Sequence, residues 1–122
     1  MKRIMVVDDE PDTQTLFEQR FRREIRSSQV DLRFFFSAEA ALDHLTSEGL
    51  PLELILSDIN MPGMGGLELL RQVKATYPHI TMIMVTAYSD PEYYQSAMQH
   101  GADGYISKPI DFKALKANLL GL

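Results

Sequence analysis

The sequence predicts an α/β protein built on a doubly wound parallel sheet of five strands. Five short runs rich in β-branched and other apolar residues alternate with five segments of helical period, which gives the order βαβαβαβαβα. The runs are continuously apolar, as in strands that helices cover on both faces. The chain has 122 residues, the size of one domain, and right-handed crossovers place helices on both sides of such a sheet. We therefore expect a single domain over residues 1–122.

Local patterns place each element in order. The expected strands are Arg3–Asp8, Leu32–Phe36, Leu54–Ser57, Thr81–Thr86 and Gly104–Ser107. Apolar residues at helical spacing mark three helices: Leu16, Phe17, Phe21 and Ile25 in the first, Ala41, Leu42 and Leu45 in the second, and Leu67, Leu70, Val73 and Tyr77 in the third. Pro11 and Pro91 suit first helical turns, Ser37 and Asp111 suit helix caps, and Gly101 suits a helix end.

Composition and charge narrow the classes of function. The net charge is −5, with 12 basic side chains against 17 acids, so we expect no direct nucleic-acid binding by this segment. The first helix extends over F-E-Q-R-F-R-R-E-I-R-S-S, and because Glu18 and Glu24 lie among its arginines, its charged face is interpreted as solvated. The absence of cysteine excludes a disulfide or a thiolate metal site. No apolar run approaches the ~20 residues of a membrane span and no signal-peptide pattern is present, so a cytoplasmic protein without membrane contact is expected.

Side chains with chemical potential gather at the carboxyl ends of the expected strands, where open parallel sheets bind their ligands. Asp8 and Asp9 end the first strand, Asp58 follows the third, Thr86 ends the fourth and Lys108 follows the fifth. Carboxylates held close together repel one another, and oxygen ligands with room for water suit Mg²⁺ or Mn²⁺ rather than zinc. A metal, a lysine and a hydroxyl around an aspartate are the groups that phosphoryl transfer uses. The pattern predicts Asp58 as the nucleophile, beside a glycine-bearing loop that leaves space for a phosphoryl group.

Taken one at a time, these residues have ordinary explanations. An acid at a strand end is more often a turn residue or a helix cap, and Lys108 alone reads as a surface lysine. The glycines of G-M-G-G also fit a simple turn, and the absence of G-x-x-x-x-G-K argues against a nucleotide-binding loop. Only the joint occurrence of the acids, the lysine and the hydroxyl favours a phosphoryl-transfer site.

Four motifs carry a resemblance to a known family. V-V-D-D-E-P, L-I-L-S-D-I-N-M-P-G-M-G-G, M-V-T-A-Y and G-A-D-G-Y-I-S-K-P-I occur in this order and resemble the motifs of response-regulator receiver domains across essentially the entire chain. The resemblance implies a flavodoxin-like sheet of order 2-1-3-4-5 with five helices. It also implies a phosphorylated switch rather than a turnover enzyme, with a sensor histidine kinase or a histidine phosphotransfer protein as phosphodonor and an effector domain or protein as output.

The resemblance implies a role for each residue at the phosphorylation site. Asp58 resembles the phosphoacceptor and is also expected to bind the metal, and Asp9 resembles the direct ligand of Mg²⁺ or Mn²⁺. Asp8 is similar to the acid that holds metal-bound water, and Asn60 to the residue whose backbone carbonyl binds the metal. Lys108 looks like the lysine that pairs with the phosphoryl group, and the Lys108–Pro109 bond is similar to the cis peptide of the family.

Two further residues resemble the parts that carry the signal away. Thr86 looks like the switch hydroxyl and Tyr105 like the switch aromatic, so phosphorylation is expected to change the face made by the fourth helix, the fifth strand and the last helix. That face contains Tyr93, Tyr94, Met98 and Phe112, and it is the expected surface for a partner or for a homodimer. Tyr88, two residues after Thr86, is expected to hinder attacking water and slow the loss of the phosphoryl group.

Rival functions are disfavoured by single positions. A haloacid-dehalogenase-type phosphatase needs a second aspartate two residues after the nucleophile, where this chain has Asn60. A flavodoxin-like electron carrier would place Ser and Thr, not the acids of D-D-E-P-D-T, after the first strand. A pseudo-receiver acting only as a binding module would lack one or more of the acids.

The G-A-D-G-Y stretch lacks the second acid that the winged-helix subfamily uses in its dimer. Both a single-domain regulator and the receiver of a longer protein with an effector after residue 122 stay open.

Overall fold

The structure is a computed structural model that describes residues 2–48, 54–87 and 91–120. Its strands are β1 (Lys2–Val7), β2 (Val30–Phe35), β3 (Leu54–Asp58), β4 (Thr81–Thr86) and β5 (Gly104–Ser107). They form one parallel sheet in the order β2-β1-β3-β4-β5. The predicted fold class and strand order are confirmed, and the observed strand boundaries differ from the predicted ones by at most two residues.

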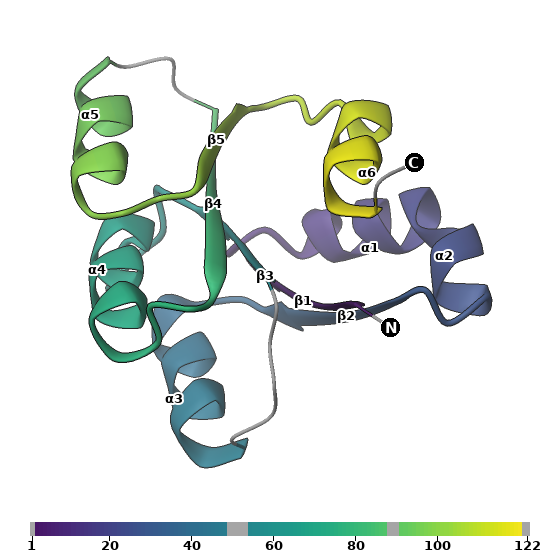
Figure 1. Cartoon of the computed structure of the whole chain (residues 1–122), viewed down its shortest axis with the longest axis horizontal. Helices are drawn as coiled ribbons and strands as arrows, with labels where there is room; N and C mark the ends of the chain where they lie inside the picture. The colour runs from purple at the N-terminus through teal and green to yellow at the C-terminus, as the bar shows by residue number, and fades with distance from the viewer. Residues whose placement is uncertain (1, 49–53, 88–90, 121–122) are drawn as a thin grey trace.

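Helices cover both faces of this sheet. They are α1 (Pro11–Arg20), α2 (Arg22–Arg26), α3 (Ala38–Glu48), α4 (Gly66–Thr76), α5 (Pro91–Gln99) and α6 (Phe112–Leu120). In Figure 1, α3, α4 and α5 lie on one side of the sheet, and α1, α2 and α6 lie on the other. None of the helices in the described part of the chain has the length and apolar character needed to cross a bilayer.

The two faces of the sheet make two separate apolar cores. One joins β-strand side chains such as Met5, Ile55 and Met84 to α3, α4 and α5. The other joins alternate strand residues such as Ile4 and Leu56 to α1 and α6. Because successive strand side chains point to opposite faces, continuously apolar strands are required to supply both cores at once. This double coverage leaves the ends of the strands as the natural place for polar groups.

The predicted first residues and caps of four helices are confirmed. Pro11 and Pro91 occupy the first positions of α1 and α5. The Ser37 Oγ accepts a hydrogen bond from the Ala40 N–H at 3.1 Å, and the Asp111 Oδ1 accepts one from the Ala114 N–H at 3.1 Å. These side chains satisfy amide groups that have no partner inside the helix.

The long first helix that the sequence predicts is divided into two helices in the structure. Phe21 separates α1 from α2 with φ −100° and ψ 16°, although its N–H still donates to the Phe17 carbonyl. Phe17 and Phe21 stack on each other with ring centroids 5.8 Å apart and are buried. Leu16 and Ile25, predicted on the same apolar stripe, are 39% and 38% exposed. The break at Phe21 therefore ends the predicted stripe before Ile25, and the described residues contain six helices instead of the predicted five.

Glu24 corrects the interpretation of the α1–α2 surface as uniformly solvated. Its residue is only 8% exposed, and its Oε1 lies 3.0 Å from the Lys116 Nζ of α6. Burial raises the pKa of Glu24, but the contact and charge of Lys116, a local backbone hydrogen bond and the nearby Arg23 together outweigh it, so the pKa lies below its usual value. The Lys116 ammonium also lies 5.2 Å from the centroid of the Phe21 ring. Glu24 thus attaches α2 to α6 through a charge pair that no local sequence pattern reveals.

Candidate functional site

The carboxyl edge of the sheet gathers the predicted acids. Asp58 is the last residue of β3, while Asp8 and Asp9 directly follow β1, the neighbouring strand. Carboxylate oxygens of these three residues lie within 4.8 Å of one another. Asp8 and Asp58 are only 6% and 7% exposed, and Asp9 is partly exposed. The structure therefore brings together the acids that the sequence predicted from separate strand ends.

Lys108 lies between two of these carboxylates. Its Nζ is 3.1 Å from the Asp8 Oδ2 and 3.5 Å from the Asp58 Oδ2. The Lys108 backbone N–H donates to the Thr86 carbonyl at 2.7 Å, which ties the end of β5 to the end of β4. The Lys108–Pro109 peptide is cis, as the motif implied. Lys108 is therefore held where its ammonium reaches both acids.

The electrostatics of the cluster show an excess of acid. Burial and the nearby Asp8 carboxylate raise the pKa of Asp58 above its usual value, even though Lys108 and the Asn60 backbone hydrogen bond favour its ionised form. Burial alone would lower the pKa of Lys108, but its hydrogen bond and attraction to Asp8 raise it overall. One ammonium therefore does not fully compensate the buried carboxylates, and the site favours a further cation.

The donor set fits a hard divalent cation. The three acids offer only carboxylate oxygens, and the partly exposed Asp9 leaves access for water. Mg²⁺ prefers oxygen ligands and keeps several waters, whereas zinc sites in proteins favour histidine and cysteine. Asn60, the other predicted ligand residue, is exposed and lies two residues after Asp58. Mg²⁺ or Mn²⁺ thus fits the residues that are present.

Asp8 has two donors besides Lys108. Its Oδ1 accepts a hydrogen bond from the Glu10 N–H at 3.0 Å, and its Oδ2 accepts one from the Thr13 hydroxyl at 3.1 Å. Sequence analysis missed Thr13, since a threonine in the first turn of a helix is ordinary. The signal that could have found it is its place in the first turn of α1, two residues after the D-D-E-P loop and four residues before the buried Phe17.

Gly66 has a different role from the one expected for the loop glycines. It is the first residue of α4, and a Cβ there would lie 2.0 Å from the Asp58 carbonyl oxygen. The Gly66 N–H also donates to the Ile59 carbonyl at 2.8 Å. A side chain at this position would push α4 away from the end of β3. Gly66 therefore serves the close packing that positions the Asp58 backbone, whereas Gly63, with φ 73°, provides the turn.

The two predicted switch residues lie on neighbouring strands. Thr86 is fully buried at the end of β4, one residue beyond Val85, which is opposite Asp58 in the sheet. Tyr105 lies in β5 opposite Met84, with its ring against the α3–α5 core and its hydroxyl buried. Tyr88 is outside the described residues.

The surface expected to carry the signal is only partly as predicted. Tyr94 and Met98 of α5 are 49% and 42% exposed, and the Tyr94 ring contacts the Tyr105 ring edge-on at 5.3 Å. Phe112 lies elsewhere, because its ring packs against Phe17 of α1 at 5.1 Å. Of the expected aromatic set, Phe112 therefore belongs to the opposite face of the sheet.

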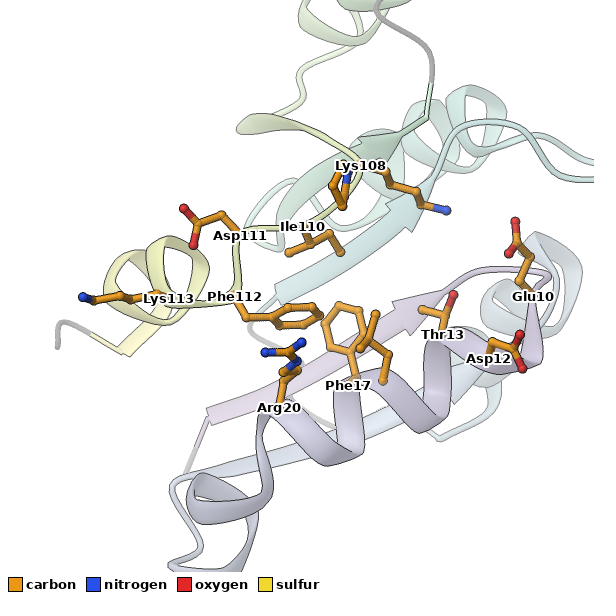
Figure 2. Close-up of a pocket in the computed structure, with 12 residues that line it drawn as sticks. Glu10, Asp12, Thr13, Phe17, Arg20, Lys108, Ile110, Asp111, Phe112 and Lys113 are labelled. Atoms are coloured by element: carbon orange, nitrogen blue, oxygen red, sulfur yellow. The ribbon is translucent and has the colours of Figure 1, made fainter.

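A groove of about 770 Å³ opens beside the acids, between α1 and the start of α6. Figure 2 shows Phe17 and Phe112 facing each other at its floor, with Lys108, Glu10 and Thr13 near one end. At the other end the Arg20 guanidinium lies 5.7 Å from the centroid of the Phe112 ring. The groove thus extends to Lys108 and Thr13, the two side chains that contact Asp8.

A profile of the response regulator receiver domain matches residues 4–120. This chain belongs to the response regulator receiver domain family. Among curated relatives, it is 38% identical to the DNA-binding transcriptional regulator NtrC of Klebsiella pneumoniae over 106 residues, which cover 87% of this chain and 21% of NtrC. It is 43% identical to the response regulator protein FleR of Pseudomonas aeruginosa over 79 residues, covering 65% of this chain and 16% of FleR. The receiver domain thus spans about a fifth of the length of such relatives.

Solved structures of receiver domains have the same fold. The CheY-like receiver domain protein of Methanospirillum hungatei superposes with a TM-score of 0.87 at 30% identity, covering 99% of this chain and 92% of that one. The response regulator protein TrrA of Thermotoga maritima, solved in complex with Mg²⁺-BeF, gives a TM-score of 0.80 at 30% identity over 99% and 98% of the two chains. Receiver domains are signalling switches of two-component systems, and an aspartyl phosphate and Mg²⁺ are features of the family.

Proposed function

We propose that this receiver domain accepts a phosphoryl group on Asp58 in a reaction that depends on Mg²⁺ or Mn²⁺. The observation that carries the proposal is the position of Asp58, buried at the end of β3, with Lys108 3.5 Å away and oxygens of Asp8 and Asp9 within 4.8 Å. The motif-based roles of Asp58, Asp9 and Lys108 agree with this arrangement. The phosphodonor is the phosphohistidine of a sensor histidine kinase or of a histidine phosphotransfer protein.

The residues would act in a simple order. An oxygen of the ionised Asp58 forms the bond to phosphorus as the phosphorus–nitrogen bond of the donor breaks, and the leaving imidazole takes up a proton. Lys108 turns to the phosphoryl oxygens and offsets their charge. Asp9, Asp58 and the Asn60 carbonyl would hold the metal directly, and Asp8 would hold it through water. When bound, the cation supplies further charge stabilisation to the transferred group.

A small phosphodonor tests the acceptor directly. Incubation with acetyl phosphate and Mg²⁺ should add one phosphoryl group to the wild type, removable by hydroxylamine, as intact-protein mass spectrometry would show. Asp58→Asn should remain unmodified, while Asp12→Asn, which changes an exposed acid of α1, should be labelled normally. Full labelling of Asp58→Asn would contradict the assignment.

Phosphorylation would change the face that we define as α5, β5 and α6. A phosphoryl group on Asp58 offers Thr86 a charge-assisted hydrogen bond, and the resulting movement of the β4 end would alter the position of Tyr105. Amide hydrogen exchange of residues 91–112, with and without beryllofluoride as a phosphoryl mimic, would follow the change. Thr86→Ala should bind beryllofluoride with a much smaller response on this face, and a response equal to wild type would refute the coupling.

The partners follow from the same proposal. The α5, β5 and α6 face would contact an effector domain or protein, and a second copy of the receiver domain is the other occupant we expect there. We place the domain over residues 1–122, in the cytoplasm, without direct binding to nucleic acid or membrane.

Slow hydrolysis of the aspartyl phosphate would return the switch to its unphosphorylated state, with Tyr88 hindering the attacking water. Tyr88→Ala should shorten the lifetime of the phosphorylated form, measured as the decay of the added mass.

A further inference from the structure

We propose that Thr13 is a positioning residue that keeps Asp8 oriented when Lys108 leaves it for the phosphoryl group. The proposal rests on the proposed function, and it adds a residue that positions one acid of the same site. It concerns one hydroxyl on α1 that neither the motifs nor the sequence pattern assigned to the site.

Two donors, Thr13 and Lys108, share the Oδ2 atom of Asp8. It accepts from the Thr13 Oγ1 at 3.1 Å and from the Lys108 Nζ, also at 3.1 Å. Asp8 is 6% exposed, so water has little access to replace a lost donor. A buried carboxylate oxygen without a donor carries the full cost of its desolvation. When one of these two donors moves away, the other therefore has to satisfy the Oδ2 oxygen.

Lys108 is the donor that departs. Its ammonium is 3.5 Å from the Asp58 Oδ2, longer than its contact with Asp8, so Asp8 holds it in the unphosphorylated structure. A phosphoryl group on Asp58 adds negative charge beside the same ammonium and draws it away from Asp8. The Thr13 hydroxyl then remains as the donor on Oδ2, while the Glu10 N–H holds Oδ1 at 3.0 Å. Asp8 keeps its direction and stays available to hold metal-bound water.

The local structure fixes the Thr13 hydroxyl for this task. Thr13 lies in the first turn of α1, two residues after Pro11, and its N–H donates to the Glu10 carbonyl at 3.1 Å. Branching at Cβ leaves a threonine few χ1 rotamers in a helix. The hydroxyl therefore stays near the Asp8 carboxylate without help from a neighbouring side chain. In Figure 2, Thr13 lies on α1 at the Glu10 end of the groove.

Removal of the hydroxyl at constant size tests the proposal. We would titrate Mg²⁺ into wild type, Thr13→Val, Thr13→Ser and Thr15→Val, and follow amide chemical shifts, both with and without beryllofluoride. Thr15 is an exposed residue of the same helix, so Thr15→Val is the matched control. Thr13→Val should bind Mg²⁺ about tenfold more weakly than wild type, since loss of a residue that orients a ligand costs at least this much. Thr13→Ser should restore the affinity, and the deficit of Thr13→Val should grow when beryllofluoride engages Lys108.

Three outcomes would overturn the positioning role. These are wild-type affinity in Thr13→Val, an equal loss in Thr13→Ser, or a deficit that is the same with and without beryllofluoride. Thermal unfolding without Mg²⁺ checks that Thr13→Val is folded, and Thr13→Ala supplies a second variant if it is not. The Mg²⁺ titration alone does not need a phosphoryl transfer, so failure of acetyl phosphate to label Asp58 would defeat the proposed function and leave the Thr13 measurement interpretable.

Discussion

The two ends of β5 carry the same pair of residue types with opposite consequences. Before β5, the Asp103 Oδ2 lies 2.6 Å from the Lys74 Nζ and accepts a hydrogen bond from the Met82 N–H at 2.9 Å. After β5, Lys108 faces both Asp8 and Asp58. Partial burial raises the pKa of Asp103, but the Lys74 and Met82 hydrogen bonds lower it below the usual value, whereas the pKa of Asp58 is raised. One acid matched to one base stabilises the fold, while an excess of acid costs stability and leaves the site to a ligand.

The direction of each pKa shift determines whether Asp103 and Asp58 stabilise or destabilise the fold at a given pH. The lowered pKa of Asp103 means that its contribution to stability is present above its ordinary value of 3.8 and is lost as the pH falls through the folded-state pKa. The raised pKa of Asp58 means that the folded state loses stability as the pH rises from 3.8 through the folded-state pKa. At neutral pH the end of β5 near Asp103 therefore supports the fold, and the end near Asp58 opposes it.

The largest expected effect on stability comes from the end near Asp103. Asp103→Asn should lower the free energy of unfolding by about 1–2 kcal/mol at pH 7, because it weakens the hydrogen bonds to Lys74 and Met82 at a partly exposed site. Chemical denaturation measures the change, with Asp12→Asn as an exposed-acid control. The difference from wild type should shrink as the pH falls from 3.8 through the lower folded-state pKa of Asp103, because protonation removes the charge of the carboxylate. A difference independent of pH would show that the ion pair contributes nothing.

Metal binding should separate the roles of the residues around Asp58. At ten times its dissociation constant, Mg²⁺ should stabilise the wild type by about 1.4 kcal/mol. Asp9→Ala should abolish this gain, since the direct ligand is lost, whereas Lys108→Ala should mostly retain it. Thermal unfolding with and without Mg²⁺ compares the three proteins. An equal loss of the gain in both variants would mean that the metal and phosphate roles are wrongly divided.

Local patterns predicted the strands and most of their ends because β3 and most of β1 and β4 are continuously apolar and polar residues stand at or just after their ends. The start of β2 was predicted two residues late because Asp31 and Arg33 interrupt its apolar run. The same patterns placed Asp8, Asp9, Asp58 and Lys108 at one edge, since parallel strands share their carboxyl ends. The burial of Glu24 escaped prediction because its partner is Lys116 in the last helix. The break at Phe21 also escaped prediction, although Phe21 contacts Phe112 and Lys116 of α6, which are distant in the sequence.

The short distances around the site were also beyond sequence patterns. The hydroxyl of Thr13 contacts Asp8 only because α1 begins against the end of β1. Gly66 looks like a turn residue in the sequence, yet its missing Cβ lets α4 begin against the Asp58 carbonyl. Periodicity predicts which elements form, whereas these contacts depend on how closely the elements approach one another.

The smallest expected effect comes from Asp58 itself. In the absence of Mg²⁺ at pH 7, Asp58→Asn should raise the free energy of unfolding, on the order of 0.5 kcal/mol, because it removes the desolvation cost of a buried carboxylate and its repulsion with Asp8, which together exceed the loss of attraction to Lys108. The gain should disappear below pH 3.8, where the wild-type carboxyl is neutral in the folded and unfolded states. Denaturant titrations at both pH values measure it, and a neutral-pH loss of stability would contradict the excess-acid account.

The most direct test of that account is the difference in unfolding free energy between wild type and Asp58→Asn, followed as Mg²⁺ is added at pH 7. Without the cation, Asp58→Asn should be the more stable protein. With saturating Mg²⁺ the order should reverse, since the wild type gains the binding free energy and the variant lacks one ligand oxygen charge. If Asp58→Asn stays the more stable protein at every Mg²⁺ concentration, the buried acids at this edge of the sheet are not held for a cation, and the account is wrong.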